Sequence, residues 1–320
     1  MTRAGGLRAL LVCCCALLLP PSLGSAGKRG SMNDFVFTCR SRGGPEIADG
    51  LAERESILRV EGRRGIATYE QHRSESDSNG EPIGRFEAPL DPTAFGRLRS
   101  VLDTGILDQL GPTSGGSFSS SLITYGFEAG GKHVQKVLSS GDHDQLTRLG
   151  PLEDVLNGIL PVLFQHPRAA LRVDVRRIAE TGGERFELVL VDIGTEAIEV
   201  ANPRTLTDHP GSRAFVEIAA APPEKPGVTP PPLRWATTLR LEPVSAGTQE
   251  PRRLRLAPGA AQAYRTETWH HTVTPGADYL VRAVFESYGD TPAAEPAAVS
   301  AYLVRGAVRS EVLELLASDR

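Results

Sequence analysis

The chain has 320 residues, of which 40% are hydrophobic and 23% charged, and its formal net charge is −4. This length and hydrophobic content are enough for two ordinary domains with buried cores. Lysine and arginine are scattered along the chain and aromatic residues make up only 6%. Nucleic-acid binding needs a basic face with interleaved aromatic residues, so we expect no nucleic-acid partner.

The first 26 residues have the pattern of a cleavable secretory signal. Arg3 and Arg8 precede an apolar run of 11 residues, Ala9–Leu19, and the small residues Gly24–Ala26 supply a cleavage site. The run is far shorter than the roughly 20 residues needed to span a bilayer, so we expect no membrane span in the mature chain. An uncleaved N-terminal anchor and a lipid-modified N-terminus are the alternatives. The signal predicts an exported protein, periplasmic or secreted.

Cys39 is the only one of the four cysteines that lies beyond the predicted signal. No intramolecular disulfide can therefore form in the mature chain. Because Cys39 lies in an apparent strand, Phe35–Cys39, we interpret it as a small buried hydrophobic side chain. A nucleophilic thiol would need a histidine partner and a lowered pKa, and no local feature indicates either.

Helix signals are confined to the first half, residues 33–166. Asp91 and Pro92 predict a helix start, as N-cap and first helical residue, and Gly105 is placed to end the helix. A second helical stretch runs over Leu146–Ile159, and Pro151 splits it by opening a new helix.

Strand signals alternate with these helices. The order strand, strand, helix, strand, strand, helix predicts a small α+β domain, an antiparallel sheet with two helices on one face. The predicted strands are Phe35–Cys39, Ser56–Val60 and Ile66–Glu70, followed by a hairpin over Ser121–Leu138 that turns at Ala129–Gly131.

The second half, residues 168–320, changes character. Short strand patterns recur about every dozen residues with Pro and Gly between them, which predicts an all-β sandwich. The predicted strands are Leu171–Ile178, Arg185–Val191, Ala214–Ala219, Ala236–Leu241, Arg253–Leu256, Tyr264–Val273, Tyr279–Glu286 and Val299–Glu314.

The segment Pro275–Val281 resembles the start of the sixth strand in immunoglobulin-like and fibronectin-type sandwiches. There a tyrosine just inside the strand sends its hydroxyl back to the preceding corner, and Tyr279 matches it. Val281 stands where true immunoglobulins have a cysteine, so the resemblance implies a branch without that disulfide. Tyr279, Val281 and Phe285 would share one buried face. The resemblance covers roughly the last 150 residues, concerns the fold alone and implies no activity.

Asp142, His143 and Asp144 are weak candidates for a metal site, because three possible ligands cluster before a helix. Helix capping explains the same pattern, since carboxylates at a helix N-terminus satisfy free amide groups. His270 and His271 are adjacent on a predicted strand and so point to opposite faces. The sequence therefore predicts neither a metal site nor a cofactor.

Sequence motifs for catalysis are missing: there is no Gly-x-Ser-x-Gly, no phosphate-binding loop and no His-Glu-x-x-His. We therefore expect a non-catalytic binding or interaction protein with an unknown protein partner. The candidate contact surface is the loop Tyr288–Ala298 together with the proline-rich run Pro222–Pro232, which also suits a stiff connection between strands. Two other classes stay open. One is an extracytoplasmic hydrolase with its site in the first domain and the sandwich as accessory, and the other is a structural component of an envelope assembly.

Overall fold

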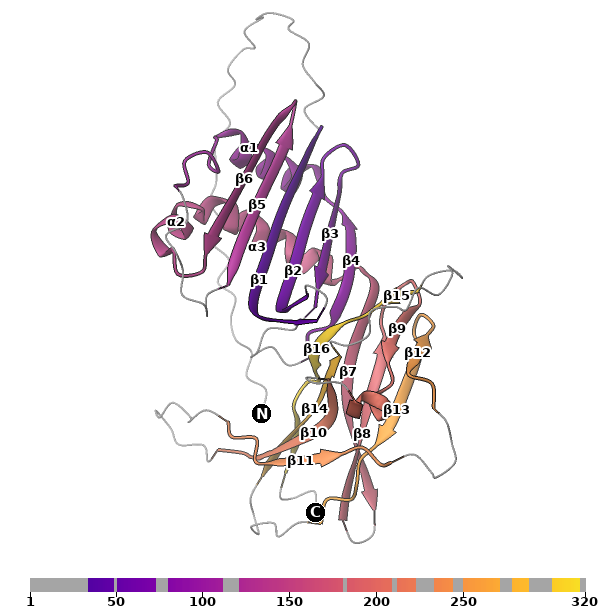
Figure 1. The fold of residues 1–320 in the computed structure, drawn as a ribbon. Helices are drawn as coiled ribbons and strands as arrows, with labels where there is room; N and C mark the ends of the chain where they lie inside the picture. Colours follow the sequence, from indigo (N-terminus) through magenta and orange to yellow (C-terminus); the bar gives the residue numbers. More distant parts are fainter. Residues whose placement is uncertain are drawn as a thin grey trace, which may run out of the picture. The chain divides into compact units, whose positions relative to one another are not determined.

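The computed structural model describes residues 34–48, 51–72, 80–111, 121–180, 183–208, 212–222, 233–243, 250–270, 278–287 and 301–316. The predicted signal, the loop Tyr288–Ala298 and all but the first residue of the proline-rich run lie outside these ranges. Residues Asn33–Arg320 form one compact unit. Within the described ranges it is mostly antiparallel β-sheet with three α-helices (Figure 1).

The largest element of the fold is a nine-stranded sheet. Its strands are β1 (Phe35–Ala48), β2 (Leu51–Glu61), β3 (Ile66–Gln71), β4 (Ile83–Pro89), β5 (Leu122–Ala129), β6 (Lys132–Ser139), β7 (Pro167–Glu180), β8 (Gly183–Asp192) and β13 (Ala261–Arg265). They adjoin in the order β13-β8-β7-β4-β3-β2-β1-β5-β6. Every neighbouring pair is antiparallel.

Two smaller sheets come from the second half. Their strands are β9 (Ile198–Ala201), β10 (Arg213–Ala220), β11 (Thr237–Arg240), β12 (Arg253–Leu256), β14 (Tyr279–Ser287), β15 (Tyr302–Leu303), β16 (Gly306–Arg309) and β17 (Leu313–Leu315). One sheet has the order β11-β10-β14-β16, with β17 also paired to β14, and the other has the order β12-β9-β15. The second half is thus β-rich, as the strand spacing predicts.

The first helix begins and ends where the local signals predict, whereas the second helical stretch starts before Leu146 and ends after Ile159. In α1 (Pro92–Asp103) the Asp91 carboxylate accepts hydrogen bonds from the backbone N–H groups of Thr93 and Ala94, at 2.7 and 3.0 Å. Gly105 follows with φ 72°, a left-handed conformation that glycine adopts without strain. Pro151 separates α2 (His143–Arg148) from α3 (Gly150–Phe164).

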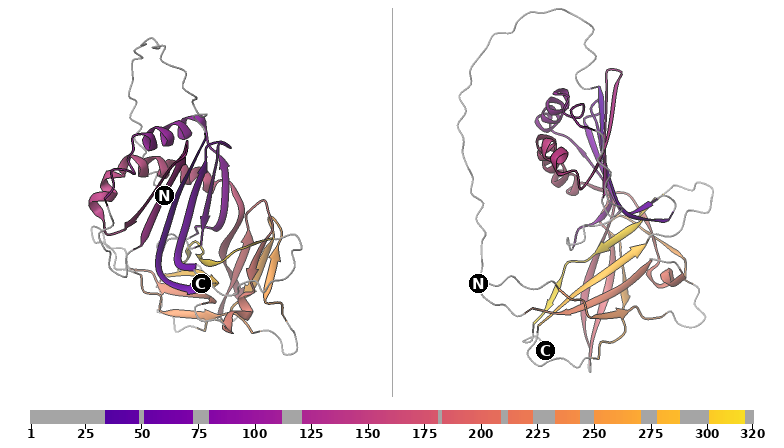
Figure 2. Two further views of the ribbon diagram at one scale, coloured as in Figure 1. Left: turned by 45° about the horizontal axis from the view of Figure 1, so that its top comes forward. Right: turned by 60° about the vertical axis from the view of Figure 1, so that its left-hand side comes forward.

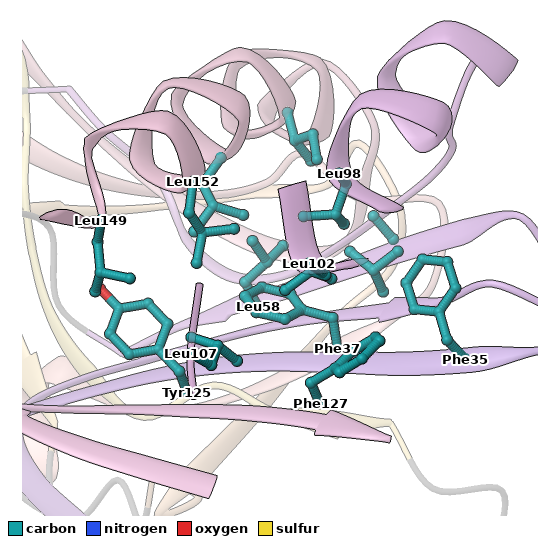
Figure 3. Packing of buried hydrophobic residues seen from close by; sticks show 14 of the residues in the cluster. Phe35, Phe37, Leu58, Leu98, Leu102, Leu107, Tyr125, Phe127, Leu149 and Leu152 are labelled. Atoms are coloured by element: carbon teal, nitrogen blue, oxygen red, sulfur yellow. The ribbon is translucent and has the colours of Figure 1, made fainter. Parts of the chain in front are cut away.

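The nine-stranded sheet buries opposite faces at its two ends. At the β6–β4 end, α1 and α3 cover one face (Figure 2) and enclose the first core, in which Phe37 and Tyr125 point toward Leu152 of α3 (Figure 3). At the β4–β13 end, a second core forms against the two smaller sheets. β4 serves both cores, with Phe86 in the first and Ile83 in the second. Residues three apart on a strand point to opposite faces, so the two cores lie on opposite faces of the sheet.

The predicted domain boundary falls inside this sheet. β7 begins at Pro167 and pairs with β4, so the strand ladder continues from the first half into the second. The sequence patterns missed β4, where Gly84 has φ 131° and interrupts the strand signal. Separate folding of residues 168–320 stays a prediction, and such a fragment would lack Ile83, which the complete second core contains.

Candidate functional site

One face of strands β1, β2, β3, β5 and β6, opposite the helices, is covered by neither helix nor sheet within the described ranges (Figure 2). On β4, which forms its margin, the same face enters the second core at Ile83. We call it the open face. Cross-strand register defines its two central rows, read from β6 to β4. They are Val137, Thr124, Arg40, Ile57, Glu70 and Arg85, and then Gln135, Gly126, Thr38, Arg59, Thr68 and Glu87.

The residues at the centre of the open face are small and polar. A Cβ atom on Gly126 would lie 2.4 Å from the hydroxyl oxygen of Thr38, so a larger residue there would require this hydroxyl to move. Around this centre the charges are paired: Arg40 Nε donates to Glu55 Oε1 at 2.7 Å, and Arg59 Nε donates to Glu61 Oε1 at 3.0 Å. The face therefore offers hydrogen-bonding groups and balanced charge, with no strong potential of one sign.

At its β4 margin the open face meets residues of the second half. The Arg85 guanidinium lies over the Tyr302 ring, 5.4 Å from its centroid, and donates to Glu196 Oε2 at 2.6 Å. Burial raises the pKa of the Tyr302 hydroxyl, and the nearby Glu70 carboxylate raises it further. The hydroxyl therefore stays protonated and can act as a hydrogen-bond donor at this margin.

Under the helices, on the other face of the sheet, Cys39, Tyr125 and Glu153 form a cluster. The Tyr125 hydroxyl donates to Glu153 Oε1 at 2.5 Å. Burial is the main cause that raises the pKa of Tyr125. Burial, helped by the Glu153 charge, raises the pKa of the Cys39 thiol to about 12. Both groups are thus held in their unreactive protonated forms, and Cys39 packs against the first core as the sequence predicts.

Cys39 should therefore resist alkylation in the folded protein. A rise in thiol pKa from 9.0 to about 12 lowers the thiolate fraction on the order of a thousandfold at neutral pH. Mass spectrometry after iodoacetamide treatment should show negligible labelling under native conditions and complete labelling in denaturant. Equal labelling rates in the two conditions would contradict the burial of this thiol.

Asp142, His143 and Asp144 do not come together as ligands. Asp142 is at the N-cap position of α2, yet its side chain makes no bond to that helix. Its Oδ2 accepts from the backbone N–H of Ser139 at the end of β6, at 3.1 Å, so the expected capping role is wrong. In the described ranges no group of three His, Cys, Asp or Glu side chains is arranged to hold a metal ion.

A shallow hollow of about 380 Å³ lies beside the β5–β6 turn. His133 Nε2 and Glu128 Oε1 are 4.0 Å apart within it, and their side chains are 55% and 65% exposed. Asp34 and Lys132 also line it, whereas no serine, threonine or cysteine does. The hollow thus contains acid–base groups in contact with water but has no hydroxyl or thiol nucleophile among its lining side chains.

The predicted strand at Tyr279 is confirmed as β14. Val281 and Phe285 are fully buried in the second core. Tyr279 is half-buried, and its ring meets Trp269 edge-on at 5.2 Å between centroids. The corner residues 271–277, to which its hydroxyl is expected to bond, lie outside the described ranges.

The two predicted contact segments follow opposite ends of the β10–β14 pair. Ala220, which pairs with Tyr279, precedes the proline-rich run, whereas Glu286, which pairs with Arg213, precedes the loop Tyr288–Ala298. An eight-residue strand is about 24 Å long. The two segments therefore leave the sheet about 24 Å apart. Because the residues that follow lie outside the described ranges, their shared contact surface stays a prediction.

Comparison with known proteins finds no matching family, and no curated protein matches the chain. None of the helices in the described ranges is long and apolar enough to cross a membrane. The fold and the open face thus define a β-rich protein with a broad, polar, uncovered sheet surface.

Proposed function

We propose that this chain is an exported, non-catalytic protein that binds a protein partner across the open face. The observation that carries the proposal is that helices cover one side of strands β1, β2, β3, β5 and β6 and leave the other side uncovered. Five strands span about 19 Å across, and strands of eight residues run about 24 Å along. A flat surface of that size is more than half of the ~800 Å² that each partner buries in a standard protein–protein interface.

The polar chemistry of the open face suits a partner that binds reversibly. Threonine and glycine at its centre and paired charges around it give a polar surface, which is typical of non-obligate interfaces. The perturbed pKa values of Cys39 and Tyr125 move both groups away from reactivity. These features support binding and give no support to nucleophilic catalysis by either group.

Arginine substitutions on the open face test the proposal. We expect Thr38→Arg combined with Thr68→Arg to abolish capture of the partner from the native exported fraction. The matched control, Ser100→Arg with Asn157→Arg, adds the same charge to exposed positions on α1 and α3 and should capture it as the unmodified protein does. Equal capture by both variants, at equal thermal stability, would contradict the open face as the binding surface.

Export is part of the proposal, and the pattern of residues 1–26 supports it. Intact-mass measurement of the protein from its native exported fraction should give a chain that begins near residue 27. A species that retains Met1–Ala26 would overturn removal of the signal.

We further propose an immunoglobulin-like arrangement for the second half, and the strand order supports it. In that fold strands A, B and E share one sheet, and strands C, F and G share the other. Here β7, β8 and β13 adjoin in the large sheet, while β10, β14 and β16 adjoin in a smaller one. In chain order β7, β8, β10, β13, β14 and β16 would fill positions A, B, C, E, F and G, with Tyr279 at the start of F.

Tyr279→Phe should destabilise the protein by about 1–3 kcal/mol, because it leaves the backbone acceptor of the tyrosine hydroxyl without a partner. Tyr279→Ala should cost more, since it also removes the ring that packs on Trp269. Urea unfolding measures both, with Tyr288→Ala as a control that we expect to be harmless. Equal tolerance of alanine at positions 279 and 288 would rule out the immunoglobulin-like assignment.

A further inference from the structure

The corner that follows β8 contains a carboxylate with no exposure to solvent. Asp192 is 0% exposed, and its Oδ1 accepts from the backbone N–H of Gly194 at 2.8 Å. Its Oδ2 is buried without a hydrogen-bond partner among the residues that the structure describes. A buried carboxylate oxygen that lacks a partner is costly when the group is ionised.

The neighbours of Asp192 do not compensate its charge. The residue opposite it on β7 is Leu171, and its own backbone pairs with Gly259 and Ala260 before β13. The only groups that lower its pKa are the backbone N–H groups of Gly194 and Ile198, and burial outweighs them, so the pKa is raised. The charged residues of the corner, Arg168 and Glu196, pair with each other at 2.9 Å instead.

The same corner connects β8 to strands β7 and β4, where the two cores meet. The backbone N–H groups of Thr195 and Glu196 donate to the Arg168 carbonyl at 3.0 and 2.8 Å. The Glu196 carboxylate also holds Arg85 of β4 at 2.6 Å. Residues 192–196 thus join β8 to the start of β7 and to β4.

We propose that Asp192 makes this corner a pH-sensitive latch. When its carboxyl group is neutral, the corner stays closed on β7 and β4. When the group ionises, opening of the corner lets water reach Oδ2, so opening becomes more favourable and loosens the contacts of Glu196. The latch does not depend on the proposed binding function.

The sign of the effect follows from linkage. Because the folded-state pKa lies above the ordinary value of 3.8, the closed corner is most stable below that value. Its stability falls as pH rises through the folded-state pKa. Carboxylates with lowered pKa, such as Glu61 and Glu250, act in the opposite direction, so global stability alone would not isolate the latch.

Amide hydrogen exchange, measured residue by residue, isolates the effect of Asp192 ionisation on the corner. Protection factors of the Gly194, Thr195 and Glu196 amides, corrected for intrinsic rates, should fall as pH rises above 3.8 and through the raised folded-state pKa of Asp192, while those of Val173 and Leu188 stay constant. Asp192→Asn should remove the fall, and Asp154→Asn, at an exposed position of α3, should keep it. An unchanged fall in Asp192→Asn, or no fall in the unmodified protein, would overturn the latch. If Asp192→Asn does not fold, NMR titration of the Asp192 carboxyl carbon decides, and a midpoint at or below the ordinary value refutes the proposal.

Discussion

Gly306→Ala should be among the most damaging single substitutions in this protein. Gly306 begins β16 with φ 125°, a conformation that L-residues rarely adopt, and a Cβ there would lie 1.4 Å from the His72 carbonyl oxygen. That oxygen accepts the backbone N–H of Ala307 at 3.0 Å, so the clash falls on a hydrogen bond between the two halves. Backbone strain and the displacement of β16 from His72 should together lower the free energy of unfolding by on the order of 4 kcal/mol or more.

Urea unfolding provides the measurement, and two glycines provide controls. Gly259 also has positive φ, 75°, but has open space around its Cβ position, so Gly259→Ala should cost only about 1–2 kcal/mol. Gly96 lies inside α1 with nothing within 4 Å, so Gly96→Ala should stabilise the protein by up to about 1 kcal/mol. If Gly306→Ala cost no more than Gly259→Ala, the close approach of β16 to His72 would be disproved.

Tyr125→Ala is the second substitution with a large expected effect. Tyr125 is 0% exposed and its ring lies between the sheet and the helices (Figure 3). Its hydroxyl donates to Glu153 of α3. Removal of the ring leaves a cavity in the first core and should cost roughly 3–5 kcal/mol, as other aromatic truncations do.

The conservative variant separates packing from hydrogen bonding. Tyr125→Phe keeps the ring and loses only the bond to Glu153, so it should cost about 1–3 kcal/mol, the range for a hydrogen bond to a charged group. Glu153→Gln keeps a neutral acceptor for the hydroxyl and should cost less than Tyr125→Phe. Equal costs for the alanine and phenylalanine variants would mean that the ring itself contributes little to the first core.

Local signals in the sequence predict several helix starts and turns, although the strand predicted over Val299–Glu314 is three short strands in the structure. Asp91 and Pro92 start α1, Pro151 opens α3, and Gly130 and Gly131, both with positive φ, turn the β5–β6 hairpin. Each signal depends on residues within a few positions of one another, because caps and tight turns satisfy neighbouring backbone groups. Val281 and Phe285 lie on the buried face of β14 that the alternation predicts, whereas burial of Val284 and Glu286 on the other face was not predicted.

Local sequence signals do not predict cross-strand and long-range contacts. The sequence missed β4, and with it the strand that joins the two halves and contributes to both cores. It also missed the open face as a surface, because period-two alternation shows that a strand has two faces without showing which one remains uncovered. The polarity of Thr38 and Thr68 was readable, but their adjacency to Gly126 and Arg59 depends on register between strands.

The sequence by itself therefore determined local features of this protein: the start of its first helix, the turn of the β5–β6 hairpin, and that its second half is built of strands. Tertiary structure alone decided how those elements combine. Arg85 meets Glu196 across 111 positions of sequence, and His72 meets Ala307 across more than 230. No local propensity encodes such pairs, because they form only when strands from both halves enter one sheet and its two ends bury opposite faces.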